Sequence, residues 1–218
     1  MNRKRLSVMV GIAVISISVI GGTLAWFTDK QEVINKISTG AIKHKIIEKF
    51  DENTSQNLLP GEEINKDVWI HNIEKSDSLL RVKITPTWVN ENGVKVEDAA
   101  SHEVKAVIKN DKWTLGNDGF YYYNEIFKSH NKDEVHPNED EISDESTLPS
   151  CYSDQILSSI LLSGETKDQE KYANRKLDVV VKSETVQVNK DAYNAEWKVE
   201  DETIKTLLNG LVDSQKNN

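Results

Sequence analysis

Stretches in which apolar and polar residues alternate recur along the chain, and this period of two predicts β-strands. In residues 59–74, for example, Ile64, Val68 and Ile70 share one face and His71 falls on the other. Many short strands separated by turns are typical of an antiparallel β-sandwich. The predicted strands lie in 41–50, 59–74, 79–89, 103–109, 119–123, 156–162 and 177–188. The segment 59–74 opens with a Pro60-Gly61 turn, so 177–188 is the longest predicted strand.

Local signals also predict how some of these strands are connected. A short polar connection joins 59–74 to 79–89, which indicates an antiparallel hairpin. Pro86 has no backbone N–H and therefore indicates an edge or a bulge. In the same stretch we expect Leu80 to point inward and Arg81 outward.

The C-terminal part of the chain is predicted to be helical. Apolar residues between Ile204 and Leu211 recur at helical spacing, and Asp201 is placed to cap the first turn. Residues 191–197 form either a short helix or a turn. We therefore expect a sandwich over 41–200 that is followed by an amphipathic helix and tail over 201–218.

One segment inside the predicted sandwich differs in composition from the rest. Between Asp133 and Glu145 the chain carries seven carboxylates and no Lys or Arg. Such a charge run is typical of a solvated, mobile excursion, which we place at 129–150. Its carboxylates could attract Ca²⁺, but the residue order of a helix-loop-helix calcium site is missing.

The N-terminal end has the pattern of a secretory signal. Three basic residues, Arg3 to Arg5, precede an uncharged run from Leu6 to Thr28, and Thr23 and Ala25 supply small residues at the −3 and −1 positions. This predicts signal-peptidase cleavage between Ala25 and Trp26. The alternative is an uncleaved membrane anchor, since about 20 apolar residues can span a bilayer.

Cleavage would leave an arm, residues 26–40, with an aromatic start and a ragged apolar pattern. Two uses are open for it. It forms an ordinary first strand on its own sheet, or it adds as a donor strand to an open sheet edge of the next molecule. Head-to-tail contacts that do not close generate a fibre. The arm residues that would fill pockets are Trp26, Phe27, Val33, Ile34 and Ile37.

The Thr-x-Ala cleavage site, the Trp26-Phe27-Thr28-Asp29 start and Ser38-Thr39-Gly40 resemble the TasA/camelysin family of secreted fibre proteins from Gram-positive bacteria. Further similar segments lie at 59–88, 112–127 and 161–188. The resemblance implies a mainly β fold, a jelly-roll-like sandwich with loop and helix insertions that follows a signal helix and an extended donor-strand arm. It also implies cleavage by a SipW-type signal peptidase.

The expected function is therefore that of a secreted structural subunit that polymerises into fibres of the biofilm matrix at the cell surface. Its partners would be copies of itself and the signal peptidase, with membrane contact only before cleavage. A minor subunit that anchors or initiates the fibre is an alternative. Surface fibres of this kind can carry isopeptide bonds, for which Lys30 and Lys36 are conceivable donors.

Charge narrows the range of partners. The full chain carries a net charge of −9, and loss of the three basic residues with the signal takes it to −12. An acidic surface repels phosphate backbones, so we expect no nucleic-acid binding. The single cysteine, Cys151, excludes an intramolecular disulfide and is expected to be buried or idle.

No catalytic motif is recognisable, and we expect no enzymatic activity, no cofactor and no metal. The five histidines, at 44, 71, 102, 130 and 136, form no His-Glu-x-x-His motif. A zinc site built from separate strands stays possible, because sequence spacing does not report such convergence. The camelysin branch of the family is described as metalloproteases, so a secreted metal-dependent peptidase is the alternative function.

Overall fold

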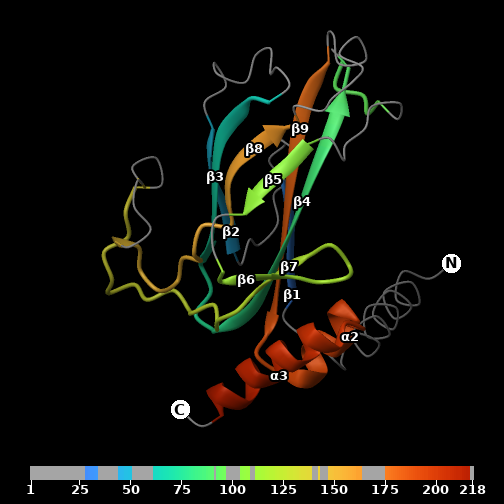
Figure 1. Cartoon of the computed structure of the whole chain (residues 1–218). Coiled ribbons are helices and arrows are strands. Elements are labelled where there is room, and N and C mark those ends of the chain that lie inside the picture. Colours follow the sequence, from blue (N-terminus) through green and yellow to red (C-terminus); the bar gives the residue numbers. More distant parts are fainter. Residues whose placement is uncertain are drawn as a thin grey trace, which may run out of the picture.

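The computed structural model describes residues 28–33, 44–50, 61–90, 92–96, 104–108, 111–138, 142, 147–163 and 175–216. Within these ranges, strands form two antiparallel sheets and two helices pack at one end of the molecule (Figure 1). The predicted signal segment 1–25 lies outside them. None of the helices in these ranges has the length and apolar character needed to span a membrane.

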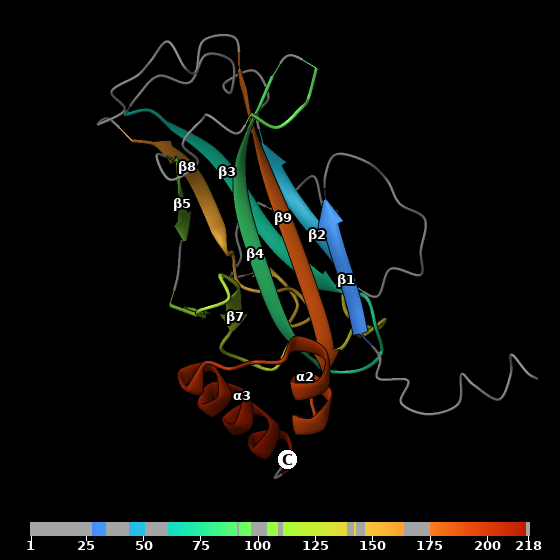
Figure 2. The same cartoon turned by 90° about the vertical axis from the view of Figure 1, so that its right-hand side faces the viewer.

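The two sheets confirm the predicted antiparallel sandwich. The first has the strand order β1 (Thr28–Val33), β9 (Lys176–Gln187), β4 (Ser78–Val89), β7 (Tyr121–Tyr123) and β6 (Trp113–Leu115). The second has the order β2 (His44–Phe50), β3 (Glu63–Asn72), β8 (Leu157–Leu162) and β5 (Val104–Ile108). Figure 2 shows β4 and β9 as the long central strands of the first sheet.

The main core lies between the sheets and follows the predicted alternation. Val82 and Val181 from the first sheet are buried in one apolar cluster with Val68, Ile70 and Leu157 from the second. Because these residues share the inner faces of their strands, burying them joins the two sheets by the hydrophobic effect.

The predicted hairpin of 59–74 and 79–89 is wrong. β3 and β4 do not pair; they belong to different sheets, and the chain crosses between the sheets at Ile73–Asp77. The reason is that β4 pairs with β9 along all twelve of its residues, and with β7 at Arg81 and Val82. A short polar connection is compatible with either arrangement.

The crossing is stabilised by one buried amide, that of Asn72. Its Nδ2 donates to the carbonyl oxygens of Ser76, Phe127 and Lys128, at 3.2, 3.3 and 2.9 Å. Its Oδ1 accepts from the backbone N–H of Glu74 at 2.9 Å. A buried amide with satisfied donors and acceptor fixes the local chain path, because each alternative path leaves polar groups unpaired.

Pro86 lies where β4 has a strand partner on one side. Its Cα partner is Val179 of β9, whereas β7 reaches only Arg81 and Val82 on the opposite edge. Pro86 can therefore stand in the ladder, because its missing N–H falls where few hydrogen bonds are made. The predicted edge position is confirmed.

Arg81 faces away from the sandwich core, as predicted, but it is buried rather than exposed to solvent. Its guanidinium donates to Glu184 at 2.6 Å and to Asp118 at 3.0 Å, and lies 4.0 Å from the ring centroid of Phe120. Trp197 covers it from the helical side, 4.8 Å from its centroid. Side chains on the outer face of this sheet are thus also buried.

The two helices, α2 (Lys190–Trp197) and α3 (Glu202–Gln215), cover that outer face. Asn189 caps α2, and Asp201 caps α3 by accepting from the backbone N–H groups of Thr203 and Ile204, which confirms the predicted cap. Their buried residues pack with Leu79, Phe120, Tyr122 and Val186 of the sheet.

We predict that Glu184→Ala lowers the free energy of unfolding by about 3 kcal/mol, because it leaves the Arg81 charge buried with only Asp118 as an anionic partner. Chemical denaturation measures the change. Asp213→Ala is the matched control: its pair with Lys190 is solvent-exposed, so the loss should stay within about 1 kcal/mol. Equal losses in both variants would contradict the assignment.

We also predict a pH-dependent contribution from Asp77, next to the crossing. Burial alone would raise its pKa, but hydrogen bonds from the Ser129 N–H and the Lys128 ammonium outweigh this and leave the pKa below the usual value of 3.8. The folded state therefore gains stability above that value and loses it as the pH falls through the lowered pKa. Asp77→Asn should reduce stability at neutral pH, with a difference from the wild type that shrinks in acid titrations. A constant difference would contradict this.

Candidate metal centre

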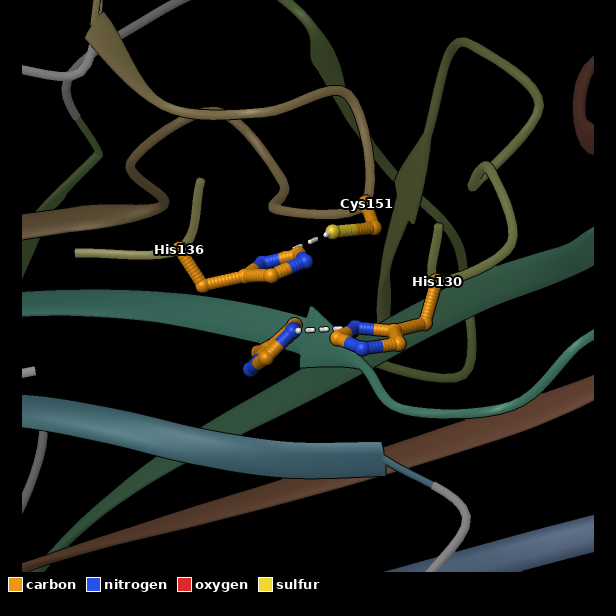
Figure 3. Close-up of side chains that lie close together, drawn as sticks. His130, His136 and Cys151 are labelled. Atoms are coloured by element: carbon orange, nitrogen blue, oxygen red, sulfur yellow. Dashed lines mark hydrogen bonds between the residues drawn. The ribbon is translucent and has the colours of Figure 1, made fainter. Parts of the chain in front are cut away.

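Four side chains from distant parts of the sequence meet on the outer face of the second sheet. They are His71, His130, His136 and Cys151, and one nitrogen from each ring together with the sulfur lie within 4.8 Å of one another. Figure 3 shows the rings of His130 and His136 and the Cys151 sulfur turned toward a common space.

Backbone pairing at the end of β3 positions His71 and Cys151. His71 and Tyr152 form an antiparallel bridge, and the Asn72 N–H donates to the Cys151 carbonyl at 2.8 Å. The Ser153 N–H likewise donates to the Ile70 carbonyl at 2.8 Å. Cys151 is therefore held beside the C-terminal end of β3 by main-chain hydrogen bonds.

The other two histidines come from the start of the acidic segment. The His130 N–H donates to the Glu74 carbonyl at 2.7 Å, which ties this residue to the crossing. Asn131 then forms a side-chain turn by accepting from the Asp133 N–H at 3.1 Å. This turn folds the chain back, so that the rings of His130 and His136 stack with centroids 4.1 Å apart.

The donor atoms face one another at close range. His71 Nε2 lies 3.3 Å from His130 Nδ1, and Cys151 Sγ lies 3.9 Å from His136 Nδ1. The second nitrogen of His136, Nε2, lies 2.8 Å from the Asn131 carbonyl oxygen and donates to it. Its Nδ1 therefore carries a lone pair, and that lone pair is on the side of the sulfur.

The surroundings favour the uncharged forms of His71, His130 and Cys151. Burial, and then the neighbouring His130 and His136, lower the pKa of His71 to about 4. Burial and His136 also lower the pKa of His130. Burial, and then Glu134, raise the pKa of the Cys151 thiol to about 11. At neutral pH these two histidines are neutral imidazoles, the form that binds metals, and the cysteine is a thiol.

Apolar residues shield the cluster from one side. Ile47 and Trp69, on the outer face of the second sheet, are buried with Ile142, Cys151 and Tyr152, and Tyr152 stacks on His71 with centroids 4.0 Å apart. Lys49 donates to the carbonyl of Ile142. The acidic segment, expected to be an excursion into solvent, thus contributes Ile142 and two histidines to a packed surface.

The donor set fits a metal such as zinc, which takes imidazole nitrogen and thiolate sulfur. A backbone carbonyl that holds the second nitrogen of a ligating histidine is the usual outer contact of such sites, and Asn131 supplies it to His136. Nδ1 of His71 is buried without a hydrogen-bond partner among the described residues, so this ring lacks the outer contact that His136 has.

No short motif predicts this cluster, because 59 residues separate His71 from His130. The sequence did contain one signal, His71 on the face opposite Ile70. Of the other two histidines, His44 is buried elsewhere, with Nε2 2.6 Å from Ser183 Oγ, and His102 lies outside the described residues. The expectation that no metal is bound remains a prediction, which this geometry opposes.

The predicted arm residues fall largely outside the described ranges. The predicted cleavage-site and arm residues outside these ranges are Thr23, Ala25, Trp26, Phe27, Ile34, Lys36 and Ile37. Two others lie in β1, which pairs antiparallel with the outer edge of β9, with Val33 opposite Val181 and Lys30 opposite Glu184. In the single chain the arm thus supplies a first strand to its own sheet.

An open cleft of about 560 Å³ lies nearby, between 123–128, 148–154 and the end of α3. Tyr152 lines both this cleft and the metal cluster. None of the four metal-donor side chains lines the cleft itself.

Comparison with known proteins identifies the family. Residues 2–192 match the family model described as "Camelysin metallo-endopeptidase". No curated protein and no solved structure gives a significant match. The match spans most of the chain and agrees with the resemblance noted in the sequence, so the chain belongs to the camelysin family.

Proposed function

We propose that the mature chain is a structural subunit of an extracellular fibre and that it has no peptidase activity. In the fibre, the arm of one molecule pairs with the β9 edge of the next. The observation that carries this proposal is the position of β1: it lies at the edge of the sheet, directly after the predicted cleavage site, and pairs with β9 alone.

The β9 edge is a suitable acceptor. β9 is twelve residues long, and its other side is fully paired with β4, whereas β1 covers only Val181 to Val186. Without an arm, this edge would expose a long row of unpaired N–H and C=O groups, which is a template for pairing with another chain. The same hydrogen bonds form whether the arm comes from its own molecule or from a neighbour.

The chain between the arm and the body is long enough for the exchange. Ten residues, 34–43, connect Val33 at the end of β1 to His44 at the start of β2. Fully extended, ten residues span about 33–36 Å, so the arm can leave its own β9 and reach the β9 of an adjacent molecule. Such an exchange of an identical element links subunits with little new surface.

Cleavage between Ala25 and Trp26 would control this step. Before cleavage the apolar segment holds the arm at the membrane, and afterwards the arm is free to pair. This order requires export and a signal peptidase of the SipW type, and it places the fibre at the cell surface and in the biofilm matrix. Family membership supports a secreted or cell-surface protein.

A covalent lock between subunits through Lys30 or Lys36 would be an additional feature. Lys30 stands opposite Glu184, whose buried carboxylate already accepts from Arg81 and pairs with Lys182. Because that carboxylate has two cationic partners, we expect fibres that fall to monomers in hot detergent.

Cysteine cross-linking distinguishes exchange from self-pairing. Glu32 and Lys182 are directly opposed Cα partners, at a spacing that a disulfide can bridge. We predict that a protein starting at Trp26 with Glu32→Cys, mixed with a second protein carrying Lys182→Cys, gives disulfide-linked heterodimers under fibre-forming conditions. Non-reducing electrophoresis and mass spectrometry of the linked peptide measure this.

Each single variant alone is the control, and neither should form the 32–182 link. The double variant on one chain should give ladders rather than monomers. Only intramolecular links at every protein concentration, with no heterodimer in the mixture, would contradict the donor-strand proposal. Deletion of 26–37 should abolish polymerisation while the body stays folded.

A metal-dependent peptidase is the second candidate, favoured by the histidine cluster and by the description of the family. Zinc peptidases keep three protein ligands and an open position for water, beside a substrate cleft. Here four donors converge, and the nearby cleft is lined by none of them. We therefore predict no casein hydrolysis above background by zinc-loaded protein. Hydrolysis that His136→Asn abolishes would establish the peptidase instead.

A further inference from the structure

We propose that His71, His130, His136 and Cys151 hold one zinc ion in a closed, structural site that fastens the 128–152 segment to the end of β3. This site is independent of fibre formation. It concerns the stability of one face of the body, not the arm.

The donor spacing approaches that of a tetrahedral zinc site. Zinc–nitrogen bonds of about 2.05 Å and a zinc–sulfur bond of about 2.3 Å give edges of about 3.3 Å between two nitrogens and about 3.6 Å between nitrogen and sulfur. The His71–His130 nitrogens lie 3.3 Å apart, and the Cys151–His136 pair lies 3.9 Å apart. All four donor atoms lie within 4.8 Å of one another, so closing the wider separations to these edges takes movements of about 1 Å.

Without an ion, the four donor atoms make only weak hydrogen bonds to one another. The contacts of 3.3 Å and 3.9 Å between the donor atoms are at the long end for hydrogen bonds. Three imidazoles and a thiol could pack together simply as a stacked aromatic cluster. That arrangement does not require donor atoms from all four residues to face one space, whereas coordination does.

The number and burial of the donors favour a structural site over a catalytic one. A catalytic zinc keeps an open position, whereas structural sites are filled by four protein ligands. Cys151 is fully buried and His71 is 7% exposed, so the ion would lie under the surface. On binding, the Cys151 S–H bond breaks, the proton passes to solvent and a sulfur–zinc bond forms; the site then carries one net positive charge.

The site would close a loop that the fold leaves lightly held. Among its described residues, the segment between Ser129 and Ser150 contains no strand and no α-helix. Its ends are fixed, by the His130 N–H at Glu74 and by the bridge at Tyr152. Ile142 is also packed against the second sheet, and coordination by His136 would add a further attachment inside the segment and restrict its conformations.

Metal binding by the mature chain tests the proposal. Protein starting at Trp26 is stripped with a chelator, titrated with Zn²⁺ alone and analysed for bound metal by mass spectrometry. We expect one zinc per chain, a higher melting temperature and slower proteolysis within 129–150. Co²⁺ in place of zinc should give visible bands of a tetrahedral site together with a sulfur-to-cobalt charge-transfer band in the near ultraviolet.

Variants separate the site from adventitious binding. Cys151→Ser should remove the charge-transfer band, and His136→Asn, at a partly exposed position, should weaken Zn²⁺ binding by more than the ~10- to 100-fold that loss of an outer contact costs. His44→Asn is the matched control, since it alters a buried histidine outside the cluster and should leave the zinc content at one. Unchanged zinc affinity in both cluster variants, or no zinc bound by the folded wild type, would overturn the proposal.

Discussion

The continuous ladder between β4 and β9 is the constraint on which the rest of the structure depends. Twelve residues of one strand pair with twelve of the other, from Ser78 opposite Gln187 to Val89 opposite Lys176. The ladder occupies one whole side of each strand, and β7 pairs with the other side of β4 at Arg81 and Val82. β3 forms no hairpin with β4 and belongs to the second sheet. The ladder also leaves the far side of β9 as the sheet edge at which β1 pairs.

Both sheets have a second buried face, and this explains where the candidate chemistry lies. The outer face of the first sheet is covered by α2 and α3 around the Arg81–Glu184 pair. The outer face of the second sheet is covered by Ile142, Leu148, Cys151 and Tyr152 around Trp69 and His71. A side chain that points away from the sandwich core is therefore also buried. In that position polar groups need hydrogen-bond partners, and the pKa values of ionisable groups shift.

The arm and the histidine cluster are attached to different parts of this frame and serve different purposes. Thr28–Val33 pairs with β9 by main-chain hydrogen bonds, which any extended segment of suitable register can make. The cluster depends on side chains that the Asn72 amide and the β3 bridge bring together. In the proposed fibre, the arm has to be exchangeable between molecules. A fixed histidine cluster would help, because each body must stay folded while its arm is bound to a neighbour.

The sequence by itself determined the local structure: the strands from their period of two, the α3 cap at Asp201, the inner faces with Ile70 and Val82, and the resemblance to the camelysin family. Tertiary structure alone decided that β3 and β4 lie in different sheets, that Arg81 is buried, and that His71 meets His130, His136 and Cys151. The physical reason is that alternation reports which side chains share a face. It does not report what covers that face, nor which strand pairs with which, because the backbone hydrogen bonds of a ladder are the same for every sequence.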